Sequence, residues 1–130
     1  MKLARFLAKG RVHQGVYREG LLLDEAGEAH RPEDVTWLLP FTPGKILGVA
    51  LNYADHAAEM GGVVPDEPII FLKPNTSVIG PNDTIVWPDM SERIDHEAEL
   101  AIVIGRICKD VPLDRVNDVI FGYTIANDVT

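Results

Sequence analysis

The chain has 130 residues, of which 46% are apolar and 25% charged, so it has enough apolar material for a globular core and is not a disordered tail. Its formal net charge of −8 argues against nucleic acid and anionic membranes as partners, because both bind basic surfaces. The single cysteine, Cys108, leaves no intrachain disulfide and fits a reducing compartment. Basic residues interrupt the apolar run of residues 1–10, which predicts no signal peptide or membrane anchor, so we expect a cytoplasmic protein.

The first third of the chain predicts a small β-rich unit. Short strands separated by glycine turns are expected at residues 2–8, 11–17 and 20–23. A helical turn or connector follows over residues 32–39, and Pro40 and Pro43 then mark a boundary. We therefore divide the chain into an N-terminal unit, residues 1–43, and a larger domain, residues 44–130.

The larger domain is predicted to be rich in buried strands separated by proline-containing loops. These strands are expected at residues 46–51, 68–72, 84–87, 97–105 and 119–126. Residues 112–119 resemble a short amphipathic helix with Pro112 near its start. Together with a helix after Asn52, these elements predict an α+β fold that is predominantly β.

Three carboxylates near the end of the chain are candidate metal ligands. Glu97 and Glu99 are one strand step apart, so on a strand their side chains point to the same face. Acidic residues at alternate positions often belong to a solvated face, and the pair alone favours that interpretation. Asp128 changes the balance, because it ends a second β-prone run that can lie beside the first strand. Partly buried like charges need a cation, a basic residue or a shared proton, and Mg²⁺ or Mn²⁺ suits oxygen ligands.

A second group of candidate residues lies on the predicted helix that follows Asn52. His56 and Glu59 are three residues apart, so on a helix they are neighbours, and the carboxylate can orient the imidazole as a general base. The alternative is a histidine and a glutamate on a solvated turn. Gly61 and Gly62 are expected to end the helix, and the loop over residues 61–67 is either a mobile lid or a plain surface loop.

Lys73 follows a predicted strand and precedes a proline. Its ammonium group can reach a substrate carboxylate or point into water, and for one lysine the solvated position is the more common.

Several motifs, in this order along the chain, resemble the fumarylacetoacetate hydrolase family. They are KILGVALNYADH at residues 45–56, FLKP at 71–74, IDHEAELAIVIG at 94–105, FGYT at 121–124 and NDVT at 127–130. The resemblance is strong over about residues 44–130. Residues 1–43 look like the small N-terminal region of members close to 2-hydroxyhepta-2,4-diene-1,7-dioate isomerase and 5-oxopent-3-ene-1,2,5-tricarboxylate decarboxylase. The implied fold is a mixed β-sandwich roll, incomplete here, preceded by a small β-rich unit.

The resemblance also implies roles for the candidate residues. Glu97, Glu99 and Asp128 would hold Mg²⁺ or Mn²⁺, with Ca²⁺ as a further candidate. His56 and Glu59 would form an acid/base dyad on a lid-like segment, and Lys73 would bind substrate. Family members act on 2-oxo acids, β-diketo acids or their enols. A cation chelated by the substrate's carboxylate and keto oxygen would stabilise the enolate as a Lewis acid.

Three functions are left open by these residues. The first is a metal-dependent isomerase or decarboxylase acting on 2-hydroxy- or 2-oxo-substituted unsaturated diacids in aromatic catabolism, because the N-terminal segment resembles that branch. The second is a C–C bond hydrolase of β-diketo acids of the acylpyruvate or fumarylpyruvate type. The third is a non-catalytic chain with a structural metal site or a solvated acidic face. The expected ligand is a small keto or hydroxy diacid, and the expected assembly is a homodimer.

The chain stops at Thr130, before segments that usually follow in the family's catalytic domain. We therefore expect a fragment, an incomplete sequence, or a half-domain that relies on a partner chain.

Overall fold

A computed structural model describes residues 1–59 and 61–130, and for His56 it describes the backbone alone. The chain divides into two compact units, Met1–Thr84 and Ile85–Thr130, and each is described by itself. Most of the regular structure is β, as the sequence predicts. Within the described residues, no helix has the length and apolar character needed to cross a membrane.

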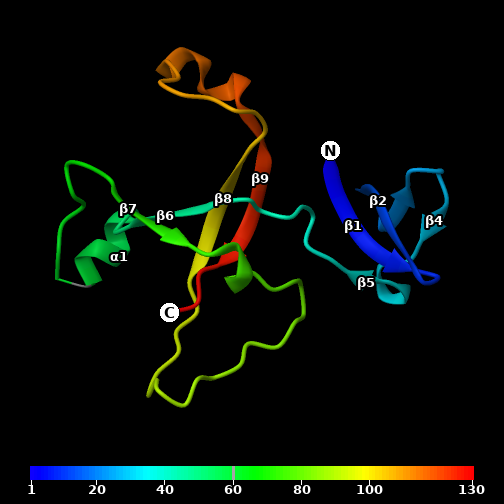
Figure 1. The fold of residues 1–130 in the computed structure, drawn as a ribbon, viewed down its shortest axis with the longest axis horizontal. Helices are drawn as coiled ribbons and strands as arrows, with labels where there is room; N and C mark the ends of the chain where they lie inside the picture. The colour runs from blue at the N-terminus through cyan, green and yellow to red at the C-terminus, as the bar shows by residue number, and fades with distance from the viewer. Residues whose placement is uncertain (60) are drawn as a thin grey trace. The chain divides into compact units, whose positions relative to one another are not determined.

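The N-terminal part of the first unit is a five-stranded antiparallel sheet in the order β4-β3-β2-β1-β5. Four of its strands, β1, β2, β4 and β5, are labelled in Figure 1. Its strands are β1 (Lys2–Ala8), β2 (Arg11–Arg18), β3 (Leu21–Asp24), β4 (Ala29–His30) and β5 (Thr36–Trp37). The three predicted strands are confirmed as β1, β2 and β3. Lys9 and Gly10 connect β1 to β2 with φ of 50° and 74°, the left-handed backbone that a tight two-residue hairpin requires.

The core of this sheet is built from alternate residues of β1 and one residue of β3. Ala4, Phe6 and Ala8 are buried with Leu22, and Phe6 and Leu22 have no exposed surface. Trp37 packs against this cluster from β5, which pairs with β1 through Phe6. Complete burial of one such large apolar side chain contributes about 1.5–3 kcal/mol, so Phe6 and Leu22 together anchor this small sheet.

Asp24 ends β3 and organises the turn that leads to β4. One oxygen of its carboxylate, Oδ1, accepts the backbone N–H groups of Ala26 at 2.9 Å and Glu28 at 2.8 Å. The Asp24 carbonyl accepts the N–H of Gly27, whose φ is 83°. These hydrogen bonds show why an aspartate stands at the start of this turn.

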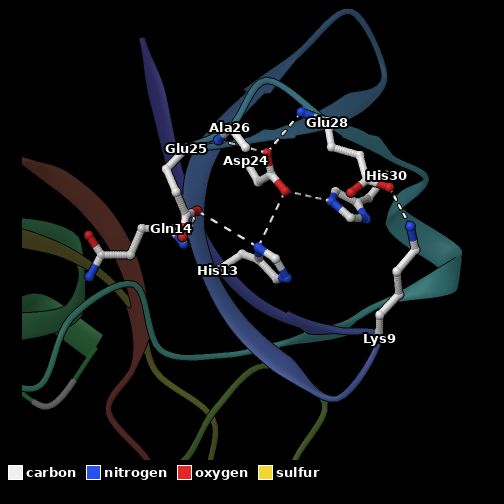
Figure 2. Close-up of polar contacts among 8 residues, drawn as sticks. All are labelled: Lys9, His13, Gln14, Asp24, Glu25, Ala26, Glu28 and His30. Carbon is white, nitrogen blue, oxygen red and sulfur yellow. Dashed lines mark hydrogen bonds and ion pairs between the residues drawn. The ribbon is translucent and has the colours of Figure 1, made fainter.

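The other oxygen of Asp24, Oδ2, faces two histidines (Figure 2). It lies 3.1 Å from Nε2 of His30 on β4 and 3.3 Å from Nδ1 of His13 on β2. The Phe6 ring stacks on His13 with ring centroids 5.5 Å apart and meets His30 edge to face at 5.2 Å. A buried charge is therefore satisfied on both oxygens at the rim of the apolar core.

The rest of the first unit contains a second, two-stranded sheet and one helix. Strand β6 (Ile46–Ala50) pairs antiparallel with β7 (Ile69–Lys73), and α1 (Ala54–Glu59) lies in the connection between them. Gly61 has a φ of 73°, and its N–H donates to Ala58, so the predicted glycine stop is confirmed. Short 3₁₀ helices occur at Pro32–Asp34 and Asn75–Ser77.

The second unit is an antiparallel ribbon of β8 (Ala98–Ile104) and β9 (Ile120–Asn127). Between them, Leu113–Asp118 forms a 3₁₀ helix where an amphipathic helix was expected. The pairing shifts by one residue between Val103 and Ile104, which is a β-bulge at the loop end of the ribbon.

The predicted strand at residues 84–87 is wrong, because this stretch has irregular backbone. Prolines at positions 81 and 88 bracket it, and each lacks the N–H that a strand ladder uses. The Trp87 indole N–H instead donates to the Ser91 carbonyl at 2.7 Å, so its polar group is satisfied locally.

The predicted boundary between residues 43 and 44 falls in the irregular segment between β5 and β6. The first compact unit continues past it to Thr84, so the boundary stays a prediction.

Asp24 makes the stability of the N-terminal sheet sensitive to acid. The hydrogen bond from His30 holds the pKa of the Asp24 carboxyl below its usual value of 3.8; burial opposes this shift, and the N–H groups of Glu28 and Ala26 add to it. A lowered native pKa stabilises the fold above the unfolded pKa, and that contribution is lost as pH falls through the native pKa.

We expect the free energy of unfolding to fall more steeply below pH ~4 in the wild type than in Asp24→Asn. Urea unfolding of chelator-treated protein at pH 7, 4 and 3 measures it. Asp34→Asn, an exposed position, controls for loss of one carboxylate. Parallel pH profiles for the wild type and Asp24→Asn would contradict the assignment.

Candidate metal centre

The pairing of β8 with β9 places the three predicted carboxylates on one face of the ribbon. Glu99 pairs with Ala126, and the Asp128 N–H donates to the Glu97 carbonyl at 2.9 Å, which puts Asp128 opposite Glu97. Residues opposite each other in an antiparallel pair point to the same face, and residues two apart on a strand do so as well. Glu97, Glu99 and Asp128 therefore belong to one face although the last lies far along the chain.

Several hydrogen bonds hold the end of the ribbon where Glu97 lies. The backbones of Asp95 and Thr130 bond to each other at 2.8 and 3.2 Å, and the Glu97 N–H donates to the side-chain oxygen of Asn127 at 2.9 Å. The Thr130 hydroxyl donates to Oε1 of Glu97 at 2.7 Å. A carboxylate held by a hydrogen bond of this kind has fewer orientations to lose when it binds an ion.

The residues next to the carboxylates on this face are small. Ala126 pairs with Glu99, and Ala101 pairs with Thr124, so little side-chain bulk stands beside the acidic groups. The opposite face carries large apolar side chains, including Leu100, 59% exposed, and Ile125, 82% exposed. The carboxylates and the large apolar side chains therefore lie on opposite faces of the ribbon.

The charge balance of this face favours a cation. In the described part of the chain, no lysine or arginine forms an ion pair with Glu97 or Glu99, while Arg93 pairs with Asp95 at 2.7 Å. All three candidate ligands are half-buried rather than fully solvated. Their carboxylate oxygens are hard donors, a set that fits Mg²⁺, Mn²⁺ or Ca²⁺.

The three carboxylates share a face, but their oxygens are not gathered around one point. Among the described residues, the group that brings three possible ligand atoms within 4.8 Å of one another is His13, Asp24 and His30. The assignment of Glu97, Glu99 and Asp128 as ligands therefore stays a prediction.

The predicted dyad and the substrate lysine belong to the other compact unit. Backbone positions of His56 and Glu59 both fall on α1, at the spacing of three that the sequence predicts, and Glu59 is exposed. The imidazole of His56 lies outside the described side chains. Lys73 is half-buried at the end of β7, where it pairs with Ile46. The roles of these three residues stay predictions.

The His13, Asp24 and His30 group was not found from the sequence. These residues follow no spacing motif, since they come from three different strands. The pairings Gly15 with Asp24 and Leu22 with His30 bring them together. The hairpin turns are the signal from which those pairings could have been worked out.

Residues 45–130 match the fumarylacetoacetate hydrolase C-terminal domain. A protein of Archaeoglobus fulgidus is 47% identical over 129 residues, which are 98% of this chain and 52% of that protein. Thus the chain spans about half the length of this relative, and the same is true of the solved structures.

Solved structures with the same fold include several enzymes, and each match covers 100% of this chain. A 5-carboxymethyl-2-hydroxymuconate delta-isomerase from Mycobacterium smegmatis is 44% identical with a TM-score of 0.85, and 55% of it is covered. A 2-hydroxyhepta-2,4-diene-1,7-dioate isomerase from Mycobacterium marinum is 34% identical, also with a TM-score of 0.85, and 54% of it is covered. A maleylpyruvate hydrolase from Sphingobium, in complex with manganese(II) and pyruvate, is 25% identical with a TM-score of 0.79 and 59% covered.

The hydrogen bond from Thr130 to Glu97 generates a test of the carboxylate site. Thr130→Val removes the hydroxyl that orients Glu97, so we expect the affinity for Mg²⁺ to fall about tenfold, the lower end of the effect of losing such a supporting contact. Isothermal titration of chelator-treated protein measures this. Thr76→Val, at an exposed position in the other unit, is the matched control. Equal Mg²⁺ affinity in both variants would remove Thr130 from the site.

Proposed function

Since the chain belongs to the fumarylacetoacetate hydrolase family, we propose that Glu97, Glu99 and Asp128 hold a divalent cation for chemistry on a small keto or hydroxy diacid. The observation that carries this proposal is the shared face of β8 and β9, on which the carboxylates of both strands lie beside small residues. Relatives in the family include isomerases and a hydrolase. The proposal applies to the full catalytic domain, of which this chain covers about half in the compared structures.

Mg²⁺ or Mn²⁺ is the proposed ion. Three carboxylates supply hard oxygen donors and no sulfur or imidazole, which suits these cations and also Ca²⁺. The Sphingobium hydrolase was solved with manganese(II) and pyruvate, a 2-oxo acid, which supports the proposal of a divalent cation and a 2-oxo acid ligand. When bound, the cation supplies Lewis-acid stabilisation of the negative charge that develops on an enolate oxygen.

The protein's own side chains would then bind and orient the substrate and move its proton. The net charge of −8 repels an anionic diacid at long range, so a local cationic group such as Lys73 is needed at the substrate carboxylate. His56 would transfer the proton next to the carbonyl, and Glu59, on the same helix, would orient its imidazole.

Isomerisation or decarboxylation of a 2-hydroxy- or 2-oxo-substituted unsaturated diacid, within aromatic catabolism, is our first choice. Two structures that carry isomerase names are 44% and 34% identical to this chain, against 25% for the maleylpyruvate hydrolase. Hydrolytic C–C cleavage of a β-diketo acid is the second choice, and it differs in that His56 would activate water rather than deliver a proton to carbon.

A non-catalytic chain with a structural cation is the alternative from another class. It uses the same carboxylates but gives no role to His56 or Lys73.

For either activity, we propose that the protein is a homodimer located in the cytoplasm. The exposed apolar face of β8 and β9 supports the dimer, because exposed apolar surface of this kind is typical of interfaces.

The carboxylate site is tested by metal titration. Wild-type protein is expected to bind Mg²⁺ and Mn²⁺ saturably, and oxalate, an enolate mimic, is expected to bind once metal is present. Glu99→Gln removes one anionic ligand and should weaken metal binding by at least tenfold. Glu92→Gln, an exposed glutamate of the same unit, should bind as the wild type does. Unchanged affinity in Glu99→Gln would show that the carboxylates are a solvated face.

The acid/base role is tested by His56→Ala. Loss of a general acid/base typically costs 10²–10⁴-fold in rate, so turnover of 2-hydroxyhepta-2,4-diene-1,7-dioate should fall by about that factor while metal affinity stays unchanged. Ultraviolet absorbance of the conjugated diacid follows isomerisation, and detection of a released small acid reports hydrolysis. Asp55→Asn, an exposed neighbour on α1, is the control. Equal turnover in wild type and His56→Ala would favour the non-catalytic alternative.

A further inference from the structure

The cluster of His13, Asp24 and His30 at the rim of the N-terminal sheet has the composition of a transition-metal site. Two imidazoles and one carboxylate come from three neighbouring strands, β2, β4 and the end of β3. Their possible ligand atoms all lie within 4.8 Å of one another. Figure 2 shows both rings directed toward the same carboxylate oxygen.

The two distances from Asp24 to the histidines fit a tetrahedral ion. Metal–ligand bonds of about 2.0–2.1 Å place adjacent ligand atoms of a tetrahedron about 3.3 Å apart. The observed separations from Asp24 Oδ2 are 3.3 Å to His13 Nδ1 and 3.1 Å to His30 Nε2. The same distances also fit N–H···O hydrogen bonds, so the metal-free protein can hold the three groups in place without a large rearrangement on binding.

The surroundings of the cluster are those of a supported site. Asp24 Oδ1 is fixed by two backbone N–H groups, which leaves Oδ2 facing the imidazoles. The Phe6 ring packs on both histidines and limits their rotation. Hydrogen-bonded carboxylates and packed imidazoles are what orient ligands in metal sites.

Two ligands of the cluster are buried and the third is partly exposed. The side chains of Asp24 and His30 are 3% and 6% exposed, while that of His13 is 16% exposed and gives an ion a way in. The Glu25 carboxylate is 63% exposed and lies 3.8 Å from His13 Nδ1, so it or a water can complete four ligands. Glu28 is also nearby but is paired with Lys9.

We propose that His13, Asp24 and His30 bind a borderline first-row cation, with Zn²⁺ as the first choice. Imidazole nitrogen suits Zn²⁺, Ni²⁺ and Cu²⁺ and is a poor ligand for Mg²⁺, whereas the all-oxygen set of Glu97, Glu99 and Asp128 suits Mg²⁺, Mn²⁺ and Ca²⁺. The bound ion joins β2, β3 and β4, so it stabilises the folded sheet by its binding free energy. This site is independent of the proposed function, because none of its residues has a role there.

The test uses the full chain, stripped with a chelator, in a Glu97→Gln/Glu99→Gln background that disables the carboxylate site. Zn²⁺ should bind there saturably and raise Tm, while Mg²⁺ at the same concentration should not. His30→Gln removes one ligand but keeps a side chain that can hydrogen-bond to Asp24, and we expect it to weaken Zn²⁺ binding at least tenfold and to abolish the rise in Tm.

Two further measurements keep the outcome clear. His13→Gln, at the most exposed ligand, repeats the test if His30→Gln fails to fold, as judged by circular dichroism. Co²⁺ in place of Zn²⁺ should give the intense visible absorption of a four-coordinate site in the background chain, and this absorption should be lost in either histidine variant. Absence of Zn²⁺ binding in the background chain, or equal affinity in a folded histidine variant, would overturn the proposal and leave a purely hydrogen-bonded cluster.

Discussion

The candidate centre in the second unit depends on one constraint, the antiparallel pairing of β8 with β9. Glu99 opposite Ala126, together with the Asp128–Glu97 backbone hydrogen bond, is what brings carboxylates from distant parts of the chain to one face. The same pairing gives that face small neighbours and sends Leu100 and Ile125 to the other. Backbone pairing thus decides which side chains share a face of the ribbon, and therefore which groups could bind an ion together.

The two candidate metal sites of this protein stabilise their carboxylates in different ways. Asp24 is satisfied internally, by backbone N–H groups on one oxygen and imidazoles on the other. Glu97 and Glu99 have no cationic side chain to pair with in the described chain, and one threonine hydroxyl is directed at Glu97. In the first arrangement the carboxylate has hydrogen-bond partners without an ion, and a bound ion would replace its contacts with the two histidines. The second concentrates negative charge that a cation would offset.

Local patterns predicted those parts of the structure whose periodicity lies in a single segment. Alternation over residues 97–105 and 119–126 was enough to predict both strands and the shared side of Glu97 and Glu99. Strands β4 and β5, two residues each, have no periodicity of their own and exist because β3 and β1 offer edges to pair with. Residues 84–87 looked like a strand, but their flanking prolines and local hydrogen bonds decided otherwise. The histidine cluster needs two strand pairings at once, which no single segment encodes.

The bulge between Val103 and Ile104 has a consequence for how this ribbon tolerates change. Side chains on a strand alternate, so one extra residue reverses the parity of everything beyond it. The bulge lies between the connecting loop and Glu99, so the stretch that carries the carboxylates keeps an unbroken parity. A change of length within residues 105–119 lies outside this paired stretch and leaves its alternation unchanged. A single residue gained or lost between Glu99 and Val103 would instead turn Glu97 and Glu99 onto the apolar face and separate them from Asp128, which follows β9.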